Sequence, residues 1–312
     1  MTRARLLTKR GKPVREWTIK PAELRALRKI RKPRMEKIKT RALRIEKGKL
    51  RVAPAQFINR DLLIPERWWP FYFCKPRYRI RKNQKNLTEI EWQRFIHAIE
   101  ALAETAMPSP TYAGFVQIHI NAMDTPAGMA WGAHTMSAMG HNGRNFLAWH
   151  REYLAKIEAR LIAINPLVTI PYWDWVTDRS AIPAALTEPG DLADWGITRG
   201  GAFNGNSLAT AAQLNALLAG TAFNAFQSTL EAAPFHNRLH GLVGGTMVTS
   251  ASPADPLFWL HHAFIDKIWA DWQALHPGVN PSNTPEVLQP PPIMTRMVAQ
   301  VLDTRALGYV YG

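Results

Sequence analysis

The sequence predicts a mainly α-helical fold with long loops and few short strands, preceded by a basic N-terminal extension. Apolar residues recur at helical spacing in several stretches after residue 85. Residues 1–85 carry 28 Lys and Arg against six Asp and Glu, whereas residues 86–312 carry 11 against 18. We therefore expect a basic extension over residues 1–75 and a mildly acidic globular domain over residues 76–312.

The basic extension alternates clusters of Lys and Arg with sparse apolar residues. Its apolar positions from Leu24 to Ile45 follow a helical period that Pro33 interrupts. We expect a solvated arm or a helix lying on the globular domain. Contact with nucleic acid or with another anionic surface is an alternative that the charge permits. Against it, Trp17 is the single aromatic residue before Phe57.

Helical signals begin after an aromatic and Pro-rich segment, residues 65–82, which we expect to be extended or a short strand. In residues 86–104, Thr88 can cap a helix and Glu91 stands at the capping-box position. Residues 111–123 predict a second helix, because their apolar residues again recur at helical spacing.

The third predicted helix lies in the stretch "HNGRNFLAWHREYLAKIEARL", residues 141–161, and continues to about residue 164. Glycine-rich turns and "IPYWDW" predict a loop region next. Residues 207–219 and 222–233 predict two further helices. The strongest amphipathic pattern covers residues 255–275, with Asp255 as N-cap. The last stretch, "VLDTRALGYVYG", predicts an extended segment.

Cysteine content and hydropathy exclude several classes of protein. Cys74 is the only cysteine, so an intrachain disulfide and a thiolate metal cluster are excluded. The N-terminus has no apolar core of a secretory signal, and no run of about 18 apolar residues predicts a membrane span. We expect a cytoplasmic protein.

The ten histidines carry the chemical signal of the sequence. His236 and His240 are four residues apart, so on a helix both imidazoles project from one face. His119, His150 and His262 each stand in the middle of a predicted amphipathic helix. One such histidine alone would usually be a core residue. Burying several imidazoles without partners would cost about 1–3 kcal/mol each, so a shared metal site is the better explanation.

The residue types around these histidines narrow the choice of metal. Imidazole ligands suit Zn, Cu, Fe or Ni. The Glu-x-x-His pairs of carboxylate-bridged di-iron bundles and the His-Glu-x-x-His motif of metalloproteases are absent. A blue-copper centre needs a cysteine ligand, and Cys74 has no histidine nearby in sequence. Six histidines in two trios favour a dinuclear copper site that exchanges electrons with O2.

These motifs resemble the tyrosinase family of type 3 copper proteins. "HNGRNFLAWHREYLAKIE" is similar to its copper A signature, and "HNRLHGLVGGTM" followed by "DPLFWLHHAFIDKIWADW" is similar to its copper B signature. The resemblance extends from "YRIRKNQKNLT" through "PYWDW" to the tyrosine motif in "LGYVYG". It implies a four-helix bundle that holds two copper ions, with O2 as co-substrate.

The resemblance also implies which residues bind the metal. Copper A would be bound by His119, His141 and His150, and copper B by His236, His240 and His262. His134 is the alternative to His119, which we prefer because His134 lies in a loop rich in Gly and Met. His261 is one step of about 100° from His262 around the helix and is expected to point elsewhere. Met139 stands where many relatives carry a thioether-forming cysteine, so no such bridge is expected.

The activity implied by the resemblance is ortho-hydroxylation of monophenols and oxidation of o-diphenols to o-quinones. Glu231 and Asn237 would hold the water that deprotonates the phenol, although the stretch from Glu231 to the copper B histidines is shorter than usual. Gly241, Ser250 and Phe258 would contact the small phenolic substrate. Asp266, one turn after His262, would orient a ligand or form an ordinary ion pair.

Four other functions compete with this interpretation. Catechol oxidases and o-aminophenol oxidases share both copper signatures. A haemocyanin-like O2 carrier shares the copper pair, but such carriers shield it with an added domain, which we expect to be missing here. The basic arm could instead make nucleic-acid binding the main function, but the presence of all six candidate ligands argues against it.

Overall fold

The computed structural model describes residues 2–7, 13–19, 43–46, 49–52, 78–104, 110–136, 139–187, 195–200 and 203–312. The chain separates into two compact units. One comprises Met1–Arg77 with Ala163–Pro166, and the other comprises Tyr78–Ile162 with Leu167–Gly312. None of the described helices is long and apolar enough to cross a membrane.

The described part of the N-terminal unit is a four-stranded sheet in the order β2-β1-β4-β3. Its strands are β1 (Thr2–Leu7), β2 (Pro13–Ile19), β3 (Leu43–Glu46) and β4 (Lys49–Val52). The helical period expected up to Ile45 is therefore wrong at its C-terminal end. Leu43 and Ile45 alternate with Arg44 and Glu46, which is the period of a strand. The rest of the expected period, residues 24–42, lies outside the described residues.

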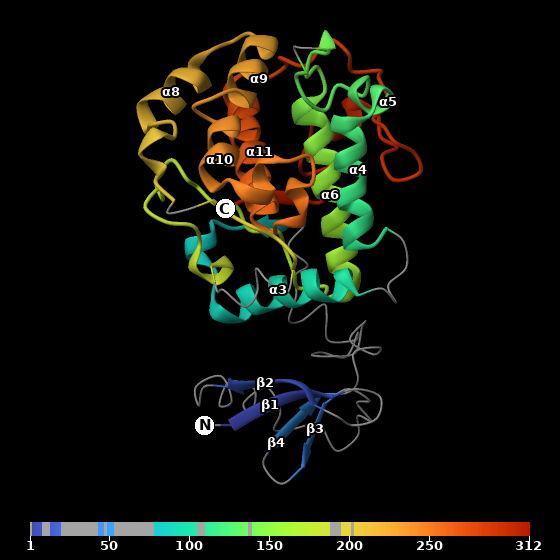
Figure 1. Ribbon diagram of the computed structural model, residues 1–312, viewed down its shortest axis with the longest axis vertical. Helices are drawn as coiled ribbons and strands as arrows, with labels where there is room; N and C mark the ends of the chain where they lie inside the picture. The colour runs from blue at the N-terminus through green and yellow to red at the C-terminus, as the bar shows by residue number, and fades with distance from the viewer. Residues whose placement is uncertain are drawn as a thin grey trace. The chain divides into compact units, whose positions relative to one another are not determined.

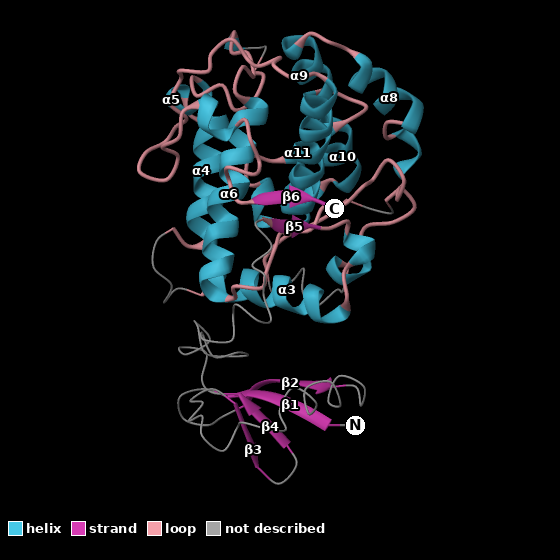
Figure 2. Ribbon diagram, turned by 180° about the vertical axis from the view of Figure 1, so that it is seen from behind, coloured by secondary structure: helices cyan, strands magenta, loops and turns pink. Residues whose placement is uncertain are grey.

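The second unit is built of helices, which confirms the predicted mainly α-helical class (Figures 1 and 2). Its main helices are α3 (Glu89–Ala103), α4 (Tyr112–Asp124), α6 (Phe146–Ile164), α8 (Ala211–Ala219), α9 (Phe223–Glu231), α10 (His236–Val243) and α11 (Leu257–Leu275). The short helix α5 (Pro126–Met129) follows α4. Two strands, β5 (Arg79–Arg81) and β6 (Tyr309–Tyr311), pair in parallel.

Local sequence signals set the ends of these helices. Thr88 and Glu91 form the predicted capping box at the start of α3, with the Glu91 backbone N–H donating to Thr88 Oγ1 over 3.3 Å. Asp255 lies just before α11, and its carboxylate accepts the backbone N–H of Leu257 over 2.9 Å. This is the capping contact expected from the sequence, because it satisfies an N–H at the start of the helix that has no partner within it.

Helices α4 and α6 run side by side, as do α10 and α11, and α3 crosses one end of the unit (Figures 1 and 2). The space between them is filled by large aromatic side chains. Six tryptophans are fully buried: Trp149, Trp173, Trp175, Trp259, Trp269 and Trp272. Each buries about 150–250 Å² of apolar surface, so this core is both stable and dry. Polar side chains inside it must therefore find partners within the protein.

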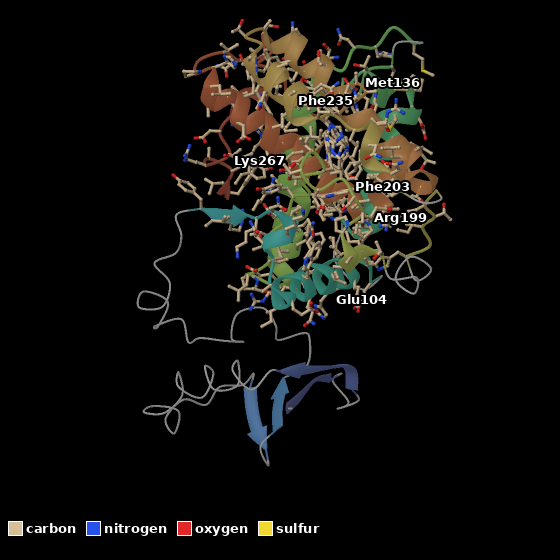
Figure 3. All side chains as sticks on the ribbon, turned by 90° about the vertical axis from the view of Figure 1, so that its left-hand side faces the viewer. Glu104, Met136, Arg199, Phe203, Phe235 and Lys267 are labelled. Atoms are coloured by element: carbon tan, nitrogen blue, oxygen red, sulfur yellow. The ribbon has the colours of Figure 1, made fainter. Side chains whose placement is uncertain are left out.

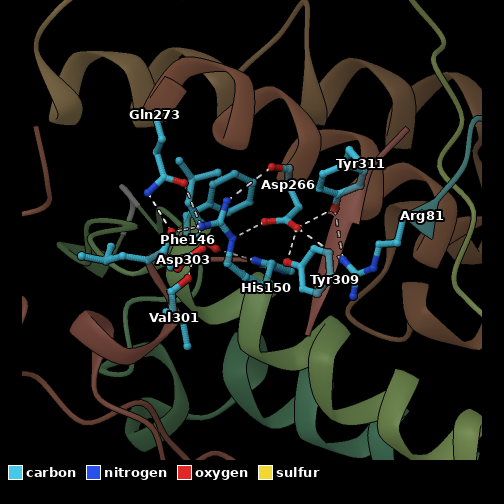
Figure 4. Close-up of polar contacts among 12 residues, drawn as sticks. Arg81, Phe146, His150, Asp266, Gln273, Val301, Asp303, Tyr309 and Tyr311 are labelled. Atoms are coloured by element: carbon cyan, nitrogen blue, oxygen red, sulfur yellow. Dashed lines mark hydrogen bonds and ion pairs between the residues drawn. The ribbon is translucent and has the colours of Figure 1, made fainter. Parts of the chain in front are cut away.

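A buried ionic network joins both ends of the second unit to its helices (Figure 4). We call it the arginine–carboxylate network; its members are Arg81, Arg151, Glu158, Asp266, Tyr309 and Tyr311. Arg81 donates to Glu158 Oε2 over 2.9 Å and to Asp266 Oδ2 over 3.3 Å. Arg151 donates to Asp266 Oδ1, and Tyr309 donates to Asp266 Oδ2 over 2.6 Å. Asp266 is thus an ion-pair residue, the second of the two roles expected for it.

Candidate metal centre

Two groups of histidines meet between the helices, where the interior contains a concentration of side-chain nitrogen atoms (Figure 3). The first group is His119 from α4, His134 from the loop before α6, and His150 from α6. The second group is His236 and His240 from α10 with His261 and His262 from α11. Within each group, one nitrogen of every ring lies within 4.8 Å of the corresponding nitrogens of the others.

Backbone carbonyls fix the orientation of the rings. The Nδ1 atoms of four histidines each lie within hydrogen-bond distance of a main-chain oxygen: His119 with Ser250 (2.7 Å), His150 with Phe146 (2.8 Å), His236 with Glu231 (3.2 Å) and His240 with Met247 (2.6 Å). A carbonyl can only accept, so Nδ1 carries the proton in these rings. In the neutral imidazole, the lone pair is then on Nε2, ready to bind a metal.

The Nε2 atoms converge where a metal ion would need them. In the second group, His262 Nε2 lies 3.3 Å from His236 Nε2 and 3.4 Å from His240 Nε2. In the first group, the Nε2 atoms of His119 and His134 are 3.1 Å apart. His150 Nε2 is buried and has no hydrogen-bond partner among the described residues. Such nitrogen-only donor sets fit copper.

Burial keeps these imidazoles neutral. It lowers the pKa of both His119 and His240 from 6.5 to about 4, against a partly compensating hydrogen bond from each ring to a carbonyl. Burial also brings the pKa of His134, His150 and His262 well below the ordinary value, and the neighbouring imidazoles add to the effect. The lone pairs needed for metal binding are therefore present at neutral pH.

The structure places His134, and not the expected His141, beside His119 and His150. His141 closes a loop instead: its backbone pairs with Met136 through hydrogen bonds of 2.8 and 3.2 Å. This pairing holds His141 at the base of the loop, while the His134 ring packs edge-on to His150, with centroids 4.8 Å apart. The sequence offers His134 only as an alternative to His119, whereas the structure places both residues in the group.

Glu231 and Asn237 make contacts that the sequence did not predict. The Glu231 carboxylate accepts the backbone N–H of Thr135 over 2.6 Å and the Thr135 hydroxyl over 2.7 Å. Glu231 therefore holds Thr135, the residue that directly follows His134. The sequence had instead suggested that Glu231 and Asn237 together hold a water molecule. Asn237 Oδ1 accepts from His236 Nδ1 over 2.8 Å. A side chain at Gly143 would put its Cβ 2.5 Å from Glu231 Oε2, so this contact requires glycine there.

The three expected substrate residues lie around the histidines in different ways. The Phe258 ring packs on His262, with centroids 4.0 Å apart. Gly241 is exposed, and no atom outside its own helix lies within 4 Å of the Cβ that a side chain would add. Ser250 acts through its backbone, because its carbonyl orients His119. Its hydroxyl donates to Asp124.

His261 does not point away from the second group, as the helical step from His262 had suggested. Its ring stacks on His236 with centroids 5.2 Å apart and planes at 20°. The imidazole extends far enough from the helix to bring a nitrogen near the other three rings. Trp175, which sequence reasoning did not assign, donates its indole N–H to His261 Nδ1 over 3.0 Å. Thr135 was missed as well, since its partner Glu231 is 96 positions away.

Comparisons with known proteins agree with this geometry. A sequence model of the common central domain of tyrosinase matches residues 109–207 and 192–275. The tyrosinase of Streptomyces glaucescens is 35% identical over 257 residues, covering 67% of this chain and 89% of the relative. Grixazone synthase of Streptomyces griseus is 29% identical over 269 residues, covering 64% and 86%. A haemocyanin functional unit from octopus has a similar fold, with a TM-score of 0.57, 26% identity, and coverage of 75% and 68%.

Proposed function

The chain belongs to the tyrosinase family and is a copper-dependent phenol oxidase. From this premise we propose that it hydroxylates monophenols at the ortho position and oxidises o-diphenols to o-quinones. The observation that carries the proposal is the pair of histidine clusters, one of three and one of four residues, in which hydrogen bonds to carbonyl groups set the orientation of four rings. The identity to Streptomyces tyrosinases supports the same activity.

The proposed ligands are His119, His134 and His150 for copper A, and His236, His240 and His262 for copper B. His134 replaces His141 in this set because its ring faces His119 and His150. When bound, the copper pair binds and activates O2. The protein supplies neutral imidazoles, carbonyl groups that orient four of the rings, and an enclosure of aromatic side chains.

Access for the substrate is proposed at Gly241. Because the space around this residue is open next to His240, the approach to copper B is not narrowed by a side chain. The aromatic ring of a phenol can then lie near Phe258 and His262, whose rings already pack at 4.0 Å. Bulky monophenols and o-diphenols are therefore proposed as substrates alongside small ones.

Assisted removal of the phenol proton matters more for hydroxylation of a monophenol than for oxidation of the more acidic o-diphenol. Asn237 is exposed, and its oxygen is fixed by His236, so its amide N–H groups can hold a water that takes this proton. The carboxylate of Glu231 is already bonded twice by Thr135. That contact favours a second candidate, an oxidase of o-diphenols or o-aminophenols with weak hydroxylase activity.

Parallel assays of the copper-loaded protein distinguish these functions. We expect turnover of tyrosine and of a catechol, with two copper ions per chain. Turnover of the catechol or of an o-aminophenol without turnover of tyrosine would establish the second candidate. Bound copper without turnover of any of the three would contradict both oxidase proposals. The Asn237→Ala variant should lose tyrosine hydroxylation more than catechol oxidation, since a monophenol is a weaker acid than an o-diphenol and depends more on an assisted removal of its proton.

A further inference from the structure

Two adjacent histidines compete for one position at copper B. His261 and His262 follow each other in α11, and both bring a ring nitrogen within 4.8 Å of the nitrogens of His236 and His240. Both are buried, with 0% and 1% of their surface exposed. Proximity alone therefore does not decide which of the two binds the metal.

The hydrogen bonds of the two rings do distinguish them. Trp175 Nε1 lies 3.0 Å from His261 Nδ1. An indole N–H can only donate, so His261 Nδ1 must accept, and its lone pair is taken up by this bond. In the neutral ring the proton is then on Nε2. Among the described residues, His262 Nδ1 has no hydrogen-bond partner, and its Nε2 faces the Nε2 atoms of His236 and His240.

We propose that Trp175 is a positioning residue that selects the copper B ligand, because its indole N–H holds His261 in the tautomer that has no available lone pair. His262 is left as the one member of the adjacent pair that can complete the trio. This inference rests on the ligand set given under Proposed function, but it does not depend on which phenol is the substrate.

The loop that carries Trp175 is fixed to the same turn of α11. The backbone N–H of Trp173 donates to the carbonyl of Leu260, directly before His261, over 3.2 Å. The Trp175 ring is fully buried and packs edge-on against Phe264, with centroids 5.0 Å apart. The indole N–H is therefore held in register with His261 by contacts independent of the bond between them.

Trp173 provides a matched control in the same loop. It is also fully buried, and its indole N–H also makes one hydrogen bond, to the carbonyl of Asp178 over 2.9 Å. Replacing either tryptophan by phenylalanine removes one buried indole bond and a similar volume. Only Trp175→Phe removes the proton donor from a candidate ligand.

The test measures retention of copper in the complete chain. Each protein is loaded with copper, and the copper remaining per chain is followed by metal analysis in excess chelator. We expect Trp175→Phe to lose one of its two ions at least tenfold faster than the wild type, because His261 then competes with His262. Trp173→Phe should match the wild type. The double variant Trp175→Phe/His261→Phe should recover wild-type retention, because the rival ligand has been removed.

A purely structural role of Trp175 predicts different results. Equal retention in Trp175→Phe and wild type, equal loss in both tryptophan variants, or a double variant without recovery would each overturn the proposal. Wild type that binds no copper would instead overturn the proposed function. Should Trp175→Phe not fold, ¹⁵N spectra of histidine-labelled wild type loaded with Cu(I) decide the question. They should show His261 protonated on Nε2, and an Nδ1 proton there would contradict the inference.

Discussion

The arginine–carboxylate network and the histidine centre are both groups of polar side chains inside the helical unit, and both include residues of α6 and α11. His150 and Arg151 are neighbours in α6, while His262 and Asp266 are one turn apart in α11. In the network, both oxygens of Glu158 and of Asp266 are bonded by residues of the chain. In the centre, nitrogens converge on one another, and that of His150 has no described partner. One region is complete without a metal, whereas the other needs one.

The largest expected difference between the two regions is in how they make the free energy of unfolding depend on pH. In metal-free protein, His119 and His240 have a folded pKa of about 4 against 6.5 ordinarily, because burial disfavours the charged ring. Above pH 6.5 both rings are neutral in the folded and unfolded chain. As the pH falls toward 4, only the unfolded chain takes up the proton readily, so each histidine lowers the free energy of unfolding by about 3 kcal/mol. Chemical denaturation between pH 7 and 4 measures this loss.

Asp266 should not contribute to that acid loss. Burial alone would raise its pKa, but Arg151 and Arg81 outweigh burial and bring it below 3.8. Asp266 therefore stays largely charged down to the lowest pH of the series. Stability that stays flat between pH 6.5 and 4 would contradict the assignment of neutral buried histidines.

Breaking the network directly should have the next largest effect. Asp266→Asn removes the charge that compensates Arg81 and Arg151, both fully buried, and should lower the free energy of unfolding by about 3–5 kcal/mol. Asp271→Asn is the control, because Asp271 pairs with Lys267 at the surface and its side chain is 45% exposed. That variant should change stability by less than about 0.5 kcal/mol. Similar losses in both variants, measured by urea denaturation, would disprove the special role of the network.

Copper binding should stabilise the histidine centre, and this gain should not depend on the arginine–carboxylate network. A ligand that binds only the folded chain at a concentration of about 100 times its Kd adds about 3 kcal/mol to the free energy of unfolding. The Asp266→Asn variant should gain the same increment, since its substitution lies outside the ligand set. His262→Asn should gain clearly less. An equal gain in His262→Asn and wild type would exclude His262 as a ligand.

The smallest expected effect comes from the contact between Glu231 and Thr135. Glu231→Gln leaves one acceptor for two donors and should cost about 1–2 kcal/mol of stability, with weaker copper retention because Thr135 adjoins His134. Thr135→Val removes the hydroxyl donor alone. A double-mutant cycle of the two should show coupling of about 1 kcal/mol, and strictly additive losses would mean that the contact does not position His134.

Sequence patterns predicted what depends on local chemistry, and missed what depends on distant contacts. The capping box of Thr88 and the position of His150 in α6 follow from residues a few positions apart. The choice of His134 over His141 depends on how a loop closes between Met136 and His141. The contact of Glu231 with Thr135 depends on how the chain folds back over 96 positions. No helical or strand period encodes either.

The pairing of β5 with β6 sets the order in which a nascent chain can complete this fold. Arg81 and Tyr311 are 230 positions apart and bond directly, and β5 and β6 pair from Arg79↔Tyr309 to Arg81↔Tyr311. During synthesis, all seven clustered histidines leave the ribosome before the tyrosines that complete the network around Asp266. Helices α6 and α11 therefore gain these contacts only after Tyr309 and Tyr311 have been synthesised, so the rigid histidine centre forms after that point.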